Sequence, residues 1–133
     1  IQSDPMTYYF STRVDDSFDD AIERVTAALG EVGFGVLTTI DVSATLKKKL
    51  DVDFDRYTIL GACNPRYAYQ ALQSEDKIGT MLPCNVIVRQ AAGDRVEVAA
   101  IDPVASMSAV DNPALGGVAT EVQSLLKGVI EKL

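Results

Sequence analysis

Hydrophobic and polar positions follow two different periods in the first thirty residues. The run TYYFSTRV at residues 7–14 is rich in aromatic and β-branched residues and places Tyr8, Phe10, Thr12 and Val14 on one face. That alternation predicts a half-buried strand. From residue 18 onward, apolar residues recur at helical spacing behind Ser17, whose hydroxyl can cap a helix: Phe18, Ile22, Val25 and Leu29. We therefore expect a helix over residues 18–30 with its apolar stripe against a sheet.

The rest of the chain continues with β-branched runs, turn signals and helix caps. Strands are predicted over residues 34–42, 57–62, 85–90 and 95–101, and helices over 43–50, 65–73, 104–108 and 113–132. The helix at 43–50 is too short to be a main packing element. Apart from the short helices at 43–50 and 104–108, the order is strand-helix-strand-strand-helix-strand-strand-helix, which indicates an α+β fold with a mostly antiparallel sheet packed by helices on one face.

Length and charge limit the classes of function that suit the chain. Its 133 residues fit a single domain, and its 12 Lys and Arg against 19 Asp and Glu give a net charge of −7. Such a chain repels phosphate backbones, so no nucleic-acid partner is expected. The cluster Lys47-Lys48-Lys49 is followed at once by aspartates and is interpreted as a solvated helix edge.

No long apolar run or secretion signal is visible, so we expect no membrane partner and a cytoplasmic location. Residues Ile1 to Pro5 precede Met6, which is typical of a natural start. We interpret residues 1–5 as a cloning remnant and residues 6–133 as one domain.

The two cysteines lie in matched surroundings, GACNP at residues 61–65 and LPCNV at 82–86. Four interpretations remain open. The pair can be small packed residues at strand ends, a dithiol that cycles with a disulfide or binds a thiophilic ligand, a metal site that borrows ligands such as Met81, or bystanders in a small-molecule pocket. With no histidine in the chain, a metal site is the weakest of these, and we expect no metal and no cofactor.

Most familiar catalytic groupings are missing. Without histidine there is no Ser-His or Cys-His dyad and no imidazole proton shuttle. Asp102 before Pro103 is better interpreted as a helix N-cap than as a general base. The tyrosines are explained by core and edge positions, although they could line a pocket: Tyr8, Tyr9, Tyr57, Tyr67 and Tyr69. The sequence does not decide whether the protein is an enzyme.

Three blocks carry a resemblance to a known family: ILGACNP at 59–65, GTMLPCNVIV at 79–88 and AIDPVASM at 100–107. In this order and spacing they resemble the prokaryotic family catalogued as domain of unknown function 302. The resemblance implies a TATA-box-binding-protein-like fold and a homodimer, but no established activity. Fold similarity to a DNA-binding protein implies no DNA binding, because function depends on the site.

The leading hypothesis is a homodimeric small-ligand-binding or accessory protein with a site near the Cys63 and Cys84 strand ends. Its candidate ligand-binding residues are Cys63, Asn64, Tyr67, Cys84, Asn85 and Asp102. The alternatives are a thiol-based redox protein that uses the two cysteines and a structural interaction module with no ligand. Because Cys63 precedes the N-cap residue Asn64, we expect the helix field to lower its pKa, and we expect burial to raise that of Cys84.

Overall fold

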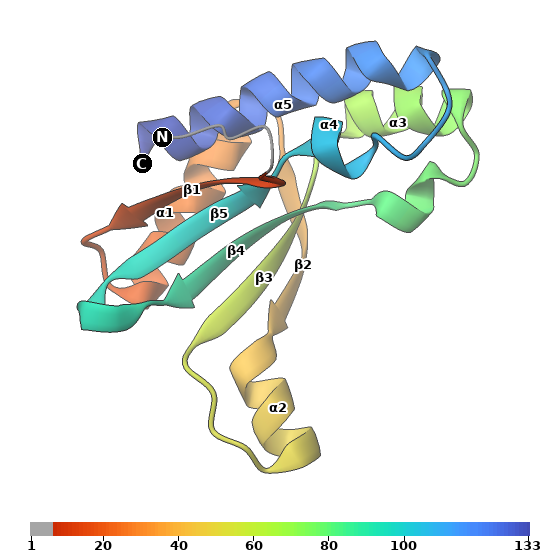
Figure 1. Cartoon of the computed structure of the whole chain (residues 1–133). Helices are drawn as coiled ribbons and strands as arrows, with labels where there is room; N and C mark the ends of the chain where they lie inside the picture. The colour runs from red at the N-terminus through yellow and green to blue at the C-terminus, as the bar shows by residue number, and fades with distance from the viewer. Residues whose placement is uncertain (1–6) are drawn as a thin grey trace.

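The structure is a computed structural model, and it describes residues 7–133, so the interpretation of residues 1–5 as a remnant lies outside the described part. Five antiparallel strands form one sheet in the order β1-β5-β4-β3-β2 (Figure 1). Their bounds are β1 Tyr9–Val14, β2 Gly35–Asp41, β3 Tyr57–Cys63, β4 Cys84–Gln90 and β5 Val96–Ile101. β4 is therefore the central strand, and β1 and β2 are the edges.

Two helices, α1 (Phe18–Glu31) and α5 (Ala114–Lys132), cover one face of the sheet (Figure 1). The alternate residues of the strands that point to these helices form the main core, with Phe10, Leu60, Val86 and Val98 almost fully buried. Ser17 caps α1 by accepting a hydrogen bond from the Asp20 amide at 3.2 Å. Burial of one sheet face against two amphipathic helices supplies most of the driving force for folding.

A second, smaller core lies beyond the sheet. Helix α3 (Pro65–Ser74) buries Ala71 in a cluster with Ile78, Met107, Leu115 and Ala119. These residues come from α5, the 3-10 helix η1 (Ile78–Met81) and the short segment that follows α4 (Pro103–Ser106). The sequence suggests that the helix at 65–73 packs against the sheet. Instead, it packs chiefly against α5.

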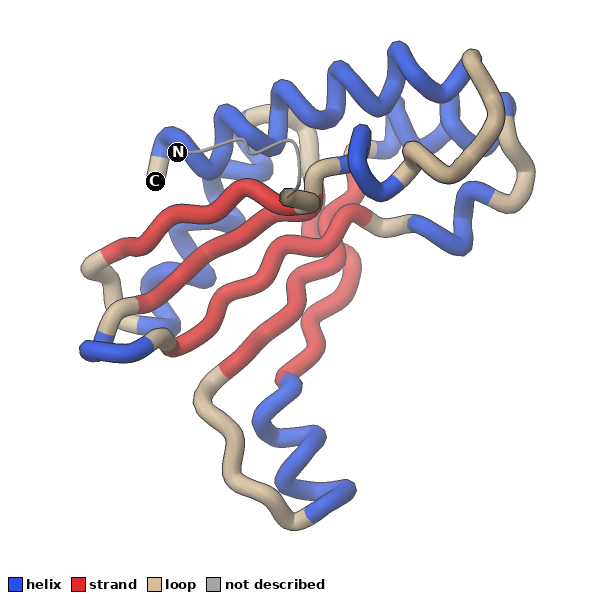
Figure 2. The backbone as a smooth tube through the Cα atoms, in the orientation of Figure 1, coloured by secondary structure: helices blue, strands red, loops and turns tan. Residues whose placement is uncertain are grey.

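Between β2 and β3 the chain leaves the sheet and returns to it, forming an arm over residues 42–56 that projects away from the core (Figure 2). The arm contains α2 (Val42–Leu50), which Asp41 caps by accepting a hydrogen bond from the Ala44 amide at 2.9 Å. No residue of α2 is buried. Tertiary burial therefore contributes little to this helix, in agreement with its interpretation as a minor packing element.

The α+β class, the antiparallel sheet and the element order agree with the sequence analysis. Most boundaries differ by one or two residues, while η1 and the 3-10 turn η2 (Ala92–Asp94) were not expected as separate elements. The turn around residues 92–94 joins β4 and β5 as an antiparallel hairpin. The classification as TATA-box-binding-protein-like stays a prediction.

Candidate functional site

The two cysteines lie on neighbouring positions of β3 and β4 but on different faces of the sheet. Cys84 pairs in register with Ala62, which is fully buried on the helix-covered side. Because successive side chains of a strand alternate faces, Cys63 points to the opposite, open side. Both thiols are free and partly buried.

Burial raises the pKa of the Cys84 thiol from 9.0 to about 11, and the nearby Cys63 adds to this rise. The direction is the one expected from the sequence. Since the thiolate is the nucleophile, this raised pKa favours the less reactive, protonated form of Cys84 at neutral pH. Thiol exchange between Cys63 and Cys84 has little support from this arrangement, because the two side chains point to different faces of β3 and β4.

We predict that an alkylating reagent such as iodoacetamide modifies Cys63 at least about tenfold faster than Cys84 at neutral pH. The reason is the buried, protonated state of Cys84. Timed labelling followed by mass spectrometry measures both rates in one sample. The variant Cys63→Ser serves as the control that reports Cys84 alone. Faster labelling at Cys84 would show that local opening, rather than protonation, controls reactivity.

Asn64 and Tyr67 line a small apolar hollow beneath α3 that also touches Cys84. Its volume is about 30 Å3, which holds little more than a water molecule. Asn64 occupies the N-cap position of α3, as predicted, but its side chain makes no capping hydrogen bond, and its amide instead donates to the Val32 carbonyl oxygen at 3.2 Å. This bond ties the loop after α1 to the end of β3. Asn64 therefore has a structural role at the strand junction.

Asp102 caps a helix, as the sequence analysis favours. Its Oδ1 accepts hydrogen bonds from the Val104 amide at 3.0 Å and from the Ala105 amide at 3.4 Å. The Gln123 side-chain amide donates to the same carboxylate at 3.1 and 3.3 Å. These bonds leave the Asp102 carboxylate engaged within the protein and join α4 to α5.

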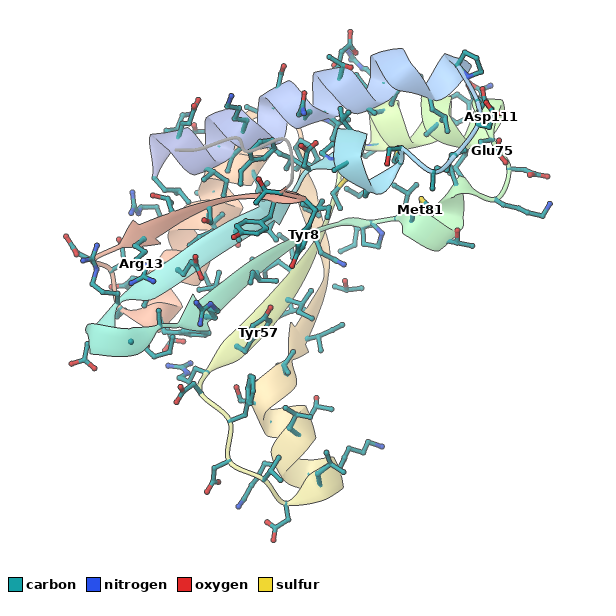
Figure 3. The ribbon with its side chains drawn as sticks, viewed as in Figure 1. Tyr8, Arg13, Tyr57, Glu75, Met81 and Asp111 are labelled. Atoms are coloured by element: carbon teal, nitrogen blue, oxygen red, sulfur yellow. The ribbon has the colours of Figure 1, made fainter. Side chains whose placement is uncertain are left out.

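The largest hollow near the candidate residues lies on the open face of the sheet. It has a volume of about 370 Å3, and β4 contributes Asn85, Ile87 and Arg89 to it. Three tyrosines form part of its wall: Tyr8, Tyr9 and Tyr57. Figure 3 shows Tyr8, Tyr57 and Arg13 on the face of the sheet that is turned toward the viewer. This volume lies within the range of pockets that hold small organic molecules.

Two further hollows adjoin this one at its ends. One, of about 270 Å3, shares Asn85 and Ile101 with it and extends past Cys84 to Met81. The other, of about 300 Å3, shares Tyr57 and Arg89 and extends toward Asp53 and Asp55 on the arm. The three hollows follow one another along β4 and share lining residues, and together they are called the sheet trough below. Met81 lies near one end of it (Figure 3).

Two rows of side chains cross the open face of the sheet, and Ile87, Ala99, Tyr57, Arg89 and Glu97 of these rows line the sheet trough. The isoleucine row consists of residues paired in register: Ile40, Ile59, Ile87, Ala99 and Ser11. The charged row lies two residues further along each strand: Tyr57, Arg89, Glu97 and Arg13. Within it, Arg89 donates to Glu97 at 2.6 Å. The trough thus has an apolar floor with a polar band at one side.

The structure divides the six candidate residues between two faces of the sheet. Asn85 and Cys63 lie on the open face, whereas Cys84 joins Asn64 and Tyr67 in the hollow under α3 and only borders the strand-end part of the trough. Asp102 caps α4. Ile87, Arg89 and Glu97 were not among the residues predicted for the site. The alternation of NVIVRQ at 85–90 already placed Asn85, Ile87 and Arg89 on one face and was the available signal.

Across residues 7–133, no group of three or more histidine, cysteine or acidic side chains is arranged to hold a metal ion. Within the same described part, none of the helices combines the length and apolar character needed to cross a membrane.

The fold and the trough define a small α+β domain with one open sheet face. The sequence model of the family described as Domain of unknown function DUF302 matches residues 10–133, so the chain belongs to this family. A solved structure similar to it is that of an uncharacterized conserved protein DUF302 from Bacillus stearothermophilus. The two chains are 28% identical over 94% of this chain and 97% of that one, with a TM-score of 0.87. No curated protein matches the chain.

Proposed function

We propose that the protein is a small-ligand-binding domain whose site is the sheet trough, with its strand-end part beside Cys84 and Asn85. The observation that supports this function is the run of three hollows along β4, in which each hollow shares lining residues with its neighbour. A site of this kind lies close to the strand ends at which the sequence analysis expected one. It needs neither thiol to react.

The composition of the trough suits a largely apolar molecule. Ile59 and Ile87 are partly exposed on the open face, where they lose contact with water if a ligand covers them. Tyrosine rings at the edge offer apolar faces together with hydroxyl groups that can orient a polar substituent. Ligand pockets commonly combine such an apolar lining with a few placed polar groups.

The test uses Nile red, a neutral dye that fluoresces in apolar surroundings. We expect saturable binding to the wild-type protein and about tenfold weaker binding to Ile87→Gln, because the amide leaves a polar group in the floor without changing the charge. Leu72→Gln is the matched control, since Leu72 is an exposed residue of α3, away from the trough. Equal binding by both variants would place the dye elsewhere and overturn the proposal.

We also propose that two copies associate through the arm. Five of the large apolar residues that are exposed lie on β2 or the arm: Leu37, Ile40, Leu50, Val52 and Phe54. The arm carries the cations Lys47 to Lys49 beside Asp51, Asp53 and Asp55, so it is complementary in charge to a second copy of itself. This arrangement supports a symmetric homodimer.

Sedimentation velocity at micromolar concentration tests this association. We expect a dimer for the wild-type protein, a monomer for Leu50→Gln, and a dimer for the control Leu72→Gln. A wild-type monomer would refute the dimer. If Ile87→Gln alone produced the monomer, the sheet trough itself would be the interface, and the ligand proposal would fail.

A further inference from the structure

The charge on the open face of the sheet differs from that of the whole protein. On the five described strands, the charged side chains that point to this face are Arg13, Arg89 and Glu97, which belong to the charged row. Two cations and one anion give this face a net positive charge in a protein of net charge −7. An acidic protein that keeps a positive site favours binding of an anion at that site.

Arg13 is the cation available to a ligand. Glu97 is the register partner of both arginines, and its carboxylate accepts a short hydrogen bond from Arg89. Arg13 is exposed and forms no ion pair with any residue of the described range. Its guanidinium offers several N–H donors arranged for a carboxylate or a similar planar anion.

The two ends of the trough set the direction in which such a ligand would lie. Asp53 and Asp55 line the hollow beyond Tyr57 and Arg89, and Asp53 is itself paired with Lys47 at 3.3 Å. Arg56 lines the same hollow but is paired with Asp19 at 2.8 Å. Within the described residues the Asp55 carboxylate has no ion-pair partner, so it disfavours an anion at the arm end. In the other direction, the isoleucine row follows at about 7 Å along the strands. Beyond it, the hollow continues over Ile101 to Met81 and Met107.

We infer that the ligand is an amphipathic monoanion, with its anionic group at the charged row beside Arg13 and its apolar body along Ile59, Ile87 and Ile101 toward Met81. This inference rests on the proposed function, because it names the class of molecule that the sheet trough takes. A saturated carboxylate of medium chain length has this chemistry. The ligand forms no covalent bond, and neither cysteine takes part in its recognition.

Displacement of Nile red by three probes of equal chain length tests the inference: decanoate, decanol and decyltrimethylammonium, each below its micelle concentration. We expect decanoate to displace the dye at about tenfold lower concentration than decanol. The cationic probe should be the weakest. In the variant Arg13→Gln, decanoate should need about the same concentration as decanol to displace the dye, while the concentration of decanol needed should not change. In the wild-type protein, added salt should reduce the difference between decanoate and decanol.

Arg66→Gln is the matched control, because it removes the same charge from the exposed surface of α3. If it weakens decanoate as much as Arg13→Gln does, net charge rather than the site selects the anion, and the inference is wrong. Equal displacement by decanoate and decanol would also overturn it, while leaving the ligand site itself intact. If Nile red does not bind at all, or binds equally to Ile87→Gln, the proposed function fails together with the inference.

Discussion

Replacing Gly61 by alanine is expected to lower the free energy of unfolding by about 2 to 3 kcal/mol. Gly61 is buried in β3, where a Cβ atom would overlap the Thr38 hydroxyl of β2 and lie 2.8 Å from Cγ of Pro83. The Thr38 side chain can rotate away, but the proline ring cannot. Strand β2 or the start of β4 must therefore shift. Urea denaturation followed by circular dichroism measures the loss.

Two variants make this prediction specific. The double variant Gly61→Ala with Thr38→Ala should recover part of the stability, since it removes one of the two overlapping groups. Gly128→Ala should instead stabilise the protein by about 0.5 to 1 kcal/mol, because that glycine lies inside α5 with open space around it. A Gly61→Ala protein as stable as the wild type would contradict the close packing of β2, β3 and Pro83.

Alkaline pH is expected to weaken the fold through Cys84. The folded protein holds the Cys84 proton with a pKa of about 11, against 9.0 for an ordinary thiol. Between these values the unfolded chain releases the proton while the folded protein keeps it, so the free energy of unfolding falls as the pH rises. The loss is about 2 kcal/mol by pH 11 and absent below about pH 8. Urea titrations over this pH range measure it.

Cys84→Ala should remove this part of the pH dependence, because the titrating group is gone, although the variant also loses some stability at every pH. Cys63→Ala should retain it, since the buried Cys84 thiol remains. Lysines and tyrosines titrate in the same range in all three proteins, so the informative quantity is the difference between the curves. If the free energy of unfolding depends on pH in the same way for the wild type and Cys84→Ala, the pKa of Cys84 is the same in the folded and unfolded states.

The elements of the fold could be predicted because their signals are local. The period-two run at β1 and the helical stripe of α1 each depend on residues close together in the chain. The packing of α3 could not be predicted in this way. Its partner face on α5 is about fifty residues further along, and nothing in residues 65–74 indicates whether Ala71 meets a strand or a helix.

The site was harder to predict, because it depends on which strands are neighbours. The matched cysteines indicated the ends of β3 and β4, and these strands are indeed adjacent. The charged row, however, requires β1 to pair with β5, which places Arg13 opposite Glu97 across more than eighty residues of sequence. Likewise, the different roles of Asn64 and Asn85 arise from the tertiary structure, although both follow a cysteine.

The arm has a consequence for how the domain can be taken apart. Asp41 and Thr58 are register partners, so the chain leaves and re-enters the sheet at neighbouring points. The intervening helix buries none of its residues, and the main core draws none of its buried members from it. A short hairpin loop could therefore replace residues 42–56 and close β2 directly onto β3. Excising the arm would remove the surface proposed for association between copies together with the arm end of the sheet trough, and would leave the strand-end part of the trough in place.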